Sequence, residues 1–127
     1  MALDWTIESR KRRVTIVADG PVTPGDLEAC LDAVSGANAL RYGKLIDFRR
    51  VELAMDQEAL LATGFRIRQF HDAPVGPLAI VVPAAPSVPL NRLLGFFAAA
   101  DRPMRVFLRH RPAERWLDAM MRDGTAS

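Results

Sequence analysis

The sequence predicts a single α/β domain with a mixed, mainly parallel sheet, flanking helices and the element order β-β-α-β-α-β-α-β-α. Its 127 residues are about the length of one domain, and no repeat, low-complexity segment or linker divides them. Hydrophobic residues make up 50% of the chain and charged residues 25%, which is typical of a globular protein. Strand-like apolar runs alternate with segments of helical periodicity, and this alternation indicates parallel strands joined by right-handed crossovers. We therefore expect one domain over residues 1–127.

The chain begins with a predicted antiparallel hairpin. Residues 4–9 alternate between apolar and polar side chains, so this strand is expected to be half-buried and near an edge of the sheet. Residues 14–18 are almost wholly apolar and rich in β-branched side chains, which predicts a central strand buried on both faces. The basic run at 10–13 is the predicted turn, and Asp-Gly-Pro at 19–21 is expected to end the second strand.

A helix start follows the hairpin. Thr23 is a good N-cap, Pro24 suits the first helical position, and Asp26 lies where the helix dipole favours a negative charge. Gly36 marks the expected end of this helix. One apolar stripe recurs between them at helical spacing: Leu27, Cys30, Leu31 and Val34.

Two strand–helix units make up the middle of the chain. Residues 44–48 predict a strand, and Asp56 is the expected cap of the next helix, with Arg66, Arg68 and Gln69 toward solvent. The expected inner face of that helix consists of Leu60, Thr63, Gly64, Ile67 and Phe70. Residues 77–82 form the clearest buried strand of the sequence.

A proline-rich loop at 83–89 leads into the last predicted elements. Ser87 is positioned to cap a helix with the apolar stripe Leu90, Leu93, Leu94 and Phe97. Residues 104–108 predict the final strand, and Pro112 is expected to open a last helix that ends in a frayed tail at 123–127. The stripe of that helix is Ala113, Trp116, Leu117 and Met120, and most phenylalanines, Phe65 among them, fit core positions.

Charge and composition disfavour several function classes. The net charge is +2, and the only basic run is the turn at 10–13, so nucleic-acid binding is not expected. No stretch approaches the ~20 apolar residues that span a bilayer, and Asp4 and Glu8 interrupt any signal-peptide pattern. We therefore expect a cytoplasmic protein without a transmembrane segment. Cys30 is the single cysteine, which excludes an internal disulfide and favours a buried structural thiol.

The sequence lacks motifs for common chemistry. His71 and His110 lie on different predicted elements, far from Cys30, so no metal site is predicted, although distant ligands could still meet in the fold. The turn at 19–25 has two glycines but no phosphate-loop pattern, and its prolines lack the N–H groups that would cradle a phosphate. No serine has the context of a nucleophile elbow. We predict no catalytic residue and no cofactor.

One polar group is brought together by the predicted topology, because ligand sites of parallel sheets lie outside the carboxyl ends of the strands. Those ends carry Asp19, then Asp47 with Arg49 and Arg50, then Ser87, and finally Arg109, His110 and Arg111. The arginines could bind a carboxylate, a phosphate or an acidic protein surface, or they could be solvated loop residues without a ligand. The predicted binding residues are Asp47, Arg49, Arg50, Arg109 and His110.

Four segments carry a resemblance to a known family. A strand ends in Asp-Gly at 19–20 before the helix start at 23–27, and Tyr-Gly-Lys-Leu-Ile-Asp occupies 42–47. The buried run at 78–82 follows, and Val-Phe precedes the helical Ala-Glu-Arg-Trp-Leu at 113–117. In this order and spacing the chain resembles the SpoIIAA-like family of the STAS superfamily, over most of its length.

The resemblance implies a mixed sheet with helices and a role in protein interaction or sensing. Many STAS-type anti-sigma-factor antagonists switch by phosphorylation of a serine or threonine after the third strand. No serine or threonine lies between Asp47 and Leu61 here, so this switch is not expected. Asp56 could mimic the negative charge, but helix capping explains it equally well.

Three functional hypotheses follow. The first is a non-enzymatic regulatory or protein-interaction domain that binds its partner through the arginine-bearing edge. The second is a sensor that holds an anionic or apolar metabolite between that edge and the helices. The third is a small enzyme with Asp47 or His110 as acid or base. The surplus of apolar residues at 90–100 also favours a homodimer.

Overall fold

The computed structural model describes residues 2–70 and 74–126, with side chains up to residue 122. One sheet contains all five strands, in the spatial order β1-β2-β3-β4-β5. The strands are β1 (Leu3–Glu8), β2 (Arg13–Val22), β3 (Gly43–Leu53), β4 (Leu78–Val81) and β5 (Met104–Phe107). β1 is antiparallel to β2, and every other neighbouring pair is parallel. The fold is the single mixed α/β domain that the sequence predicts.

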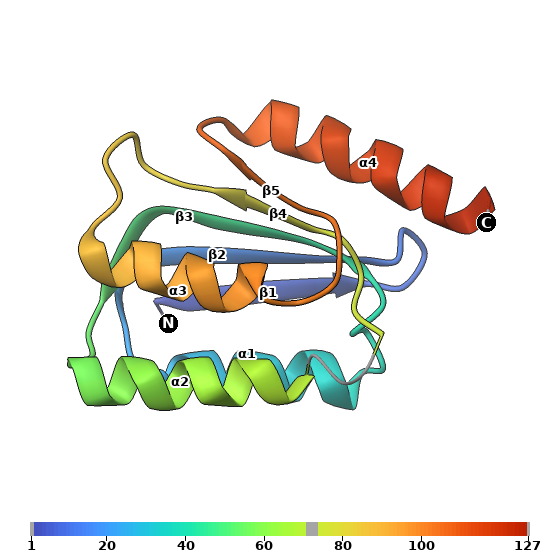
Figure 1. The fold of residues 1–127 in the computed structure, drawn as a ribbon. Coiled ribbons are helices and arrows are strands. Elements are labelled where there is room, and N and C mark those ends of the chain that lie inside the picture. The colour runs from blue at the N-terminus through green and yellow to red at the C-terminus, as the bar shows by residue number, and fades with distance from the viewer. Residues whose placement is uncertain (1, 71–73, 127) are drawn as a thin grey trace.

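Four helices pack against this sheet: α1 (Pro24–Gly36), α2 (Gln57–Gln69), α3 (Val88–Ala98) and α4 (His110–Ala126). The first three are crossovers between neighbouring parallel strands, so right-handed connections place them on the same face. Figure 1 shows α1, α2 and α3 below the sheet and α4 above it. The core is therefore divided in two, with the larger part under α1–α3 and a smaller one centred on Leu45, Val81 and Leu117 beneath α4.

The predicted starts of α1, α2 and α3 are confirmed. Thr23 and Asp26 form a reciprocal capping box at α1, each accepting a hydrogen bond from the other's backbone N–H. Asp56 caps α2 through the N–H of Ala59, and Ser87 caps α3 through the N–H of Leu90.

The prediction that residues 19–21 end the second strand is wrong. β2 continues to Val22, with a register shift after Val17 and a positive φ of 90° at Gly20. β1 pairs with β2 only as far as Ala18, which is opposite Leu3, the first residue of β1. Pro21 therefore has no neighbouring strand on that side, and no ladder hydrogen bond requires the N–H group that proline lacks. The claim of burial on both faces is also wrong, since α4 packs mainly on β3, β4 and β5 and Val17 is 42% exposed.

Other boundaries also differ from the prediction. β3 runs to Leu53, because its polar second half pairs with the extended end of β2. α4 starts at His110, before Pro112, and it continues to Ala126 where a frayed tail was expected; Ser127 lies outside the described residues. On α2, Phe65 is 67% exposed and not part of the core, while Arg66 is half-buried and pairs with Glu28 and Asp32 of α1.

Candidate functional site

An apolar cavity of about 70 Å³ lies between the sheet and the helices α1–α3. Sixteen residues line it, and all but Lys44 and Arg102 are apolar or, in the case of Cys30, a thiol. The lining residues Leu31, Leu40, Phe70 and Val75 are only partly buried, so they mark where the cavity approaches the surface. Its walls therefore suit an apolar molecule of small size.

Lys44 reaches the cavity because of strand alternation. Successive side chains of a strand point to opposite faces, so Lys44, Ile46 and Phe48 of β3 all face the helices α1–α3. Lys44 is only 8% exposed. A charged side chain thus occupies an inward position of a central strand, where apolar residues are the rule.

The Lys44 ammonium is held by backbone carbonyl groups. Its Nζ donates to the carbonyl oxygen of Leu40 and, at 3.0 Å, to that of Tyr42. Burial, together with the positive charge of Arg102, lowers the pKa of Lys44 to about 7. Lys44 is therefore present in both its charged and its neutral form near neutral pH.

The segment that supplies these carbonyls, residues 39–42, is fixed from both sides. The Ala39 N–H donates to Val34 at the end of α1, and the Gly76 N–H donates to the Leu40 oxygen at 2.9 Å. A Cβ at Gly76 would overlap the carbonyl oxygens of Arg41 and Tyr42, so only glycine fits against this segment. The carbonyl support of Lys44 is consequently built into the packing of two loops.

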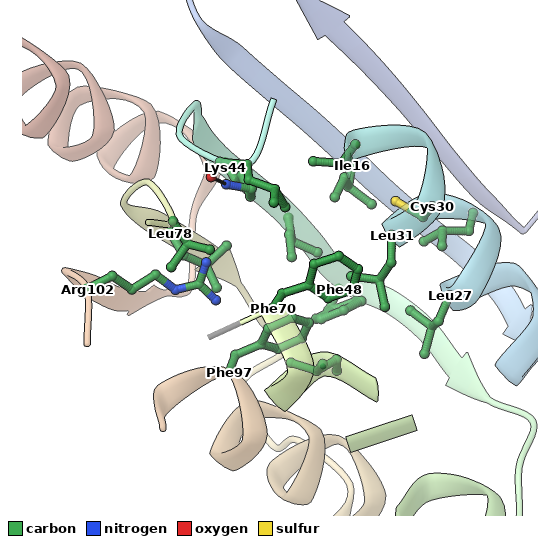
Figure 2. A pocket seen from close by; sticks show the side chains of 16 residues that line it. Ile16, Leu27, Cys30, Leu31, Lys44, Phe48, Phe70, Leu78, Phe97 and Arg102 are labelled. Atoms are coloured by element: carbon green, nitrogen blue, oxygen red, sulfur yellow. Dashed lines mark hydrogen bonds between the residues drawn. The ribbon is translucent and has the colours of Figure 1, made fainter. Parts of the chain in front are cut away.

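Arg102 approaches the cavity from the loop between α3 and β5. Figure 2 shows its guanidinium pointing into the cavity on the same side as Lys44, with Cys30 and Leu27 on the opposite side. Burial lowers the pKa of Arg102 to about 10, so it stays charged at neutral pH. Its Nε is buried and has no hydrogen-bond partner among the described residues.

The cavity combines two cations with no described acidic residue in its lining. Cations buried away from water normally pair with carboxylates, and an unsatisfied N–H is costly. Cys30 contributes only a protonated thiol, because burial raises its pKa to about 11. The arrangement can neutralise an anionic group at one end of the cavity while the apolar walls enclose the rest of the ligand.

The site predicted from the sequence lies at the other end of the strands. Asp47, Arg49, Arg50 and Asp19 line one surface hollow, as expected from the strand ends. Asp47 accepts from Arg49 at 3.1 Å (Nε) and 2.7 Å (Nη2), so these two opposite charges compensate each other. Burial alone would raise the pKa of Asp47, but the hydrogen bonds and charge of Arg49, with a smaller effect of His110, hold it below its ordinary value.

The other residues predicted for this edge of the sheet do not line the hollow around Asp47 and Arg49. His110 lies at the start of α4 and contacts Glu114 at 2.6 Å, while Arg109 and Arg111 are exposed. Ser87 serves as the α3 cap. His71 lies outside the described residues, and no cluster of three or more metal-ligating side chains occurs in the rest.

Neither cation of the cavity was predicted as a binding residue from the sequence. For Lys44 a signal was present, since a lone lysine shares the inward face of a predicted strand with Ile46 and Phe48. For Arg102 the sequence contains no such signal, because residues in a loop have no periodicity from which the direction of a side chain could be predicted. The rule that ligands lie at the carboxyl ends of parallel strands also pointed away from Lys44, which is at the amino end of β3.

Comparison with known structures places this fold. A protein of Shewanella loihica PV-4, described as an uncharacterized member of the DUF3478 family with a SpoIIAA-like fold, superposes with a TM-score of 0.64. The match covers 91% of this chain and 92% of that chain, at 18% sequence identity. The chain has a SpoIIAA-like fold. At this identity the likeness concerns the fold alone.

The fold suggested by the sequence resemblance is thereby confirmed. No family model matches the sequence, and neither does any curated protein. Within the described part of the SpoIIAA-like chain, no helix is long and apolar enough to cross a membrane.

Proposed function

We propose that this SpoIIAA-like domain is a non-enzymatic, cytoplasmic binding domain for a small apolar molecule that carries one carboxylate. The observation that supports the proposal is the pair Lys44 and Arg102 at one end of an otherwise apolar cavity with no acidic residue in its described lining. A carboxylate would accept from the Arg102 guanidinium, whose Nε has no partner among the described residues. Binding would also offset the electrostatic cost of burying Lys44 and, in part, Arg102.

The size of the cavity limits the ligand. Its volume is about 70 Å³, and an engineered apolar cavity of ~150 Å³ holds benzene. A short aliphatic chain is therefore suitable, whereas a long acyl chain would have to displace side chains at the partly exposed end, near Leu31 and Phe70. Isocaproate, a branched short-chain carboxylate, is larger than benzene, so it serves as a probe only if side chains at this partly exposed end move outward to admit it. Isocaproamide is its uncharged counterpart.

Calorimetric titration with isocaproate tests the proposal. Arg102→Gln removes the permanent charge, and we expect it to weaken binding roughly tenfold to a hundredfold, the loss typical of one charge-assisted hydrogen bond. Arg92→Gln is the matched control, since Arg92 is exposed on α3 and does not line the cavity. Equal affinities of the wild type and the Arg102 variant would contradict the proposal.

A protein-interaction edge is the second candidate function. The Arg50 side chain is 80% exposed, and Arg109 and Arg111 are also exposed, so positive charge is available to an acidic partner there. Because Asp47 compensates Arg49, this edge offers less positive charge than the sequence alone implies. A partner that stays bound after Arg49 and Arg109 are both replaced by alanine would rule out this edge.

A homodimer remains a separate prediction. Much of the apolar surplus at 90–100 is used within the domain, since Leu90, Leu93 and Phe97 are buried. A dimer would have to use the outer side of α3, where Val88 is 66% exposed. Light scattering that shows a monomer at high concentration would contradict it.

A further inference from the structure

The chain contains two lysines in opposite environments. The side chain of Lys11 is 69% exposed in the hairpin turn, where it lies 3.7 Å from Glu8. Lys44 is 8% exposed and lines the cavity. A lysine amine becomes a nucleophile when an apolar site and a neighbouring cation disfavour its charged form, and Lys44 has both.

The hydrogen bonds of Lys44 also orient its nitrogen. A neutral amine has two N–H groups, and Leu40 and Tyr42 provide two carbonyl acceptors. When both N–H groups donate to them, the lone pair points away from these carbonyls. With a pKa of about 7, an appreciable fraction of Lys44 is neutral at physiological pH, whereas an ordinary lysine is neutral in roughly one molecule in a thousand.

We propose that Lys44 reversibly forms an imine with small apolar α-keto acids that enter the cavity. The Nζ lone pair attacks the keto carbon, and one proton of the nitrogen moves to the former carbonyl oxygen to give a carbinolamine. The carbinolamine then loses its hydroxyl group and the one remaining N–H proton as one molecule of water. A C=N bond replaces the C=O bond, with no net oxidation or reduction. This inference rests on the proposed function, because the same cavity must admit the ligand.

Arg102 gives the reaction its selectivity. Its charge contributes to lowering the pKa of Lys44, so the two groups are electrostatically close, and Figure 2 shows them on the same side of the cavity. In an α-keto acid the carboxylate is bonded directly to the keto carbon. Arg102 can thus hold the carboxylate while Lys44 meets the carbonyl, and the apolar lining receives the aliphatic side chain.

The experiment traps the imine on the folded wild-type protein. Protein is incubated with α-ketoisocaproate and cyanoborohydride, which reduces an imine to a stable secondary amine, and the adduct is located by peptide mass spectrometry. We expect the Lys44 adduct to exceed the Lys11 adduct by about tenfold or more, and the two to become equal in urea. Arg102→Gln should lower the Lys44 adduct, Arg92→Gln should leave it unchanged, and isocaproate should compete with its formation.

Two results would overturn the inference, and they are distinguishable. If isocaproate binds but Lys44 is labelled no more than Lys11, the cavity is a binding site without covalent chemistry. If isocaproate does not bind and no Lys44 adduct forms, both the imine and the proposed function are wrong. The Lys44→Met variant, which keeps the aliphatic stem, must lose any adduct in this part of the chain.

Discussion

The Lys44 ammonium and the Arg102 guanidinium line the same cavity, although one comes from the start of β3 and the other from the loop before β5. Burial lowers the pKa of Lys44 to about 7, and the positive charge of Arg102 contributes to this shift. Arg102 itself keeps its charge at neutral pH. The site therefore has one permanent cation and one that titrates in the physiological range.

This titration predicts a rise of stability with pH. Below about pH 7 Lys44 is charged in the folded and the unfolded state; above its unfolded pKa it is neutral in both. Between these limits only the unfolded chain binds the proton, so the free energy of unfolding increases with pH. From about pH 7 to about pH 8.5 we expect a gain of about 1.5 kcal/mol in urea denaturation.

Two variants isolate the contribution of Lys44. Lys44→Met should abolish this gain, whereas Lys11→Met should retain it, because Lys11 is exposed. The range stops near pH 8.5 because the Cys30 thiol has the opposite effect at higher pH. Its folded pKa is raised to about 11, so the unfolded state loses that proton first and stability falls. Equal pH profiles for wild type and Lys44→Met would contradict the account.

A matched pair of glycines tests the packing of α2 against α3. A Cβ at Gly64 would overlap the Phe96 ring, whereas a Cβ at Gly95 would meet nothing within 4 Å. We expect Gly64→Ala to destabilise the protein by about 1–3 kcal/mol through overpacking. Gly95→Ala should stabilise it by about 0.5–1 kcal/mol, since alanine favours a helix over glycine. Chemical denaturation measures the change in the free energy of unfolding for both variants. If Gly64→Ala stabilised the protein as much as Gly95→Ala, the predicted overlap with the Phe96 ring would be contradicted.

Gly76 tests the link between the loops and Lys44. Replacement by alanine pushes against the Arg41 and Tyr42 carbonyls, and the Tyr42 carbonyl accepts from Lys44. We expect Gly76→Ala to lower stability by about 1–3 kcal/mol and to change the titration of Lys44. NMR of the Lys44 Nζ or of its side-chain methylenes follows that titration. An unchanged pKa of Lys44 in a folded Gly76→Ala variant would contradict this link.

Cys30 reports on access to the far side of the cavity. Cys30 is 5% exposed, and burial raises the pKa of its thiol to about 11, so little thiolate is present near neutral pH. We expect a thiol reagent to modify it only on unfolding, and isocaproate to slow the reaction because binding stabilises the folded state. Rapid modification of the folded protein would show that the cavity is open as far as Cys30.

Most elements could be predicted because their signals are local. Thr23 and Asp26 fix the start of α1, and the apolar run at 78–82 contains β4. The extended ends of β2 and β3 could not, because the pairing of Asp19 with Arg50 and of Val22 with Leu53 is a backbone ladder between polar or breaking segments. In both strands the mainly apolar run that predicts the strand stops several positions before the backbone pairing between the strands stops.

The site was less accessible to sequence reasoning. The residues from Asp47 to Arg50 do lie together in one hollow, as the strand ends predict, but the Asp47–Arg49 ion pair depends on side-chain geometry. The exposure of Phe65 likewise depends on which side of α2 meets α1 and α3. Lys44 and Arg102 line one cavity because the α3–β5 loop brings Arg102 to it, and no local sequence pattern specifies the path of that loop.

The most direct test of the central claim is a methyl NMR titration with isocaproate and, in parallel, with isocaproamide. The account predicts saturable shifts for methyl groups in the cavity lining, such as those of Leu27, Ile46 and Leu78, with the carboxylate binding more tightly than the amide. Equal binding of the two probes, or shifts confined to residues around Arg49 and Arg109, would contradict a cavity that recognises an apolar anion through Lys44 and Arg102.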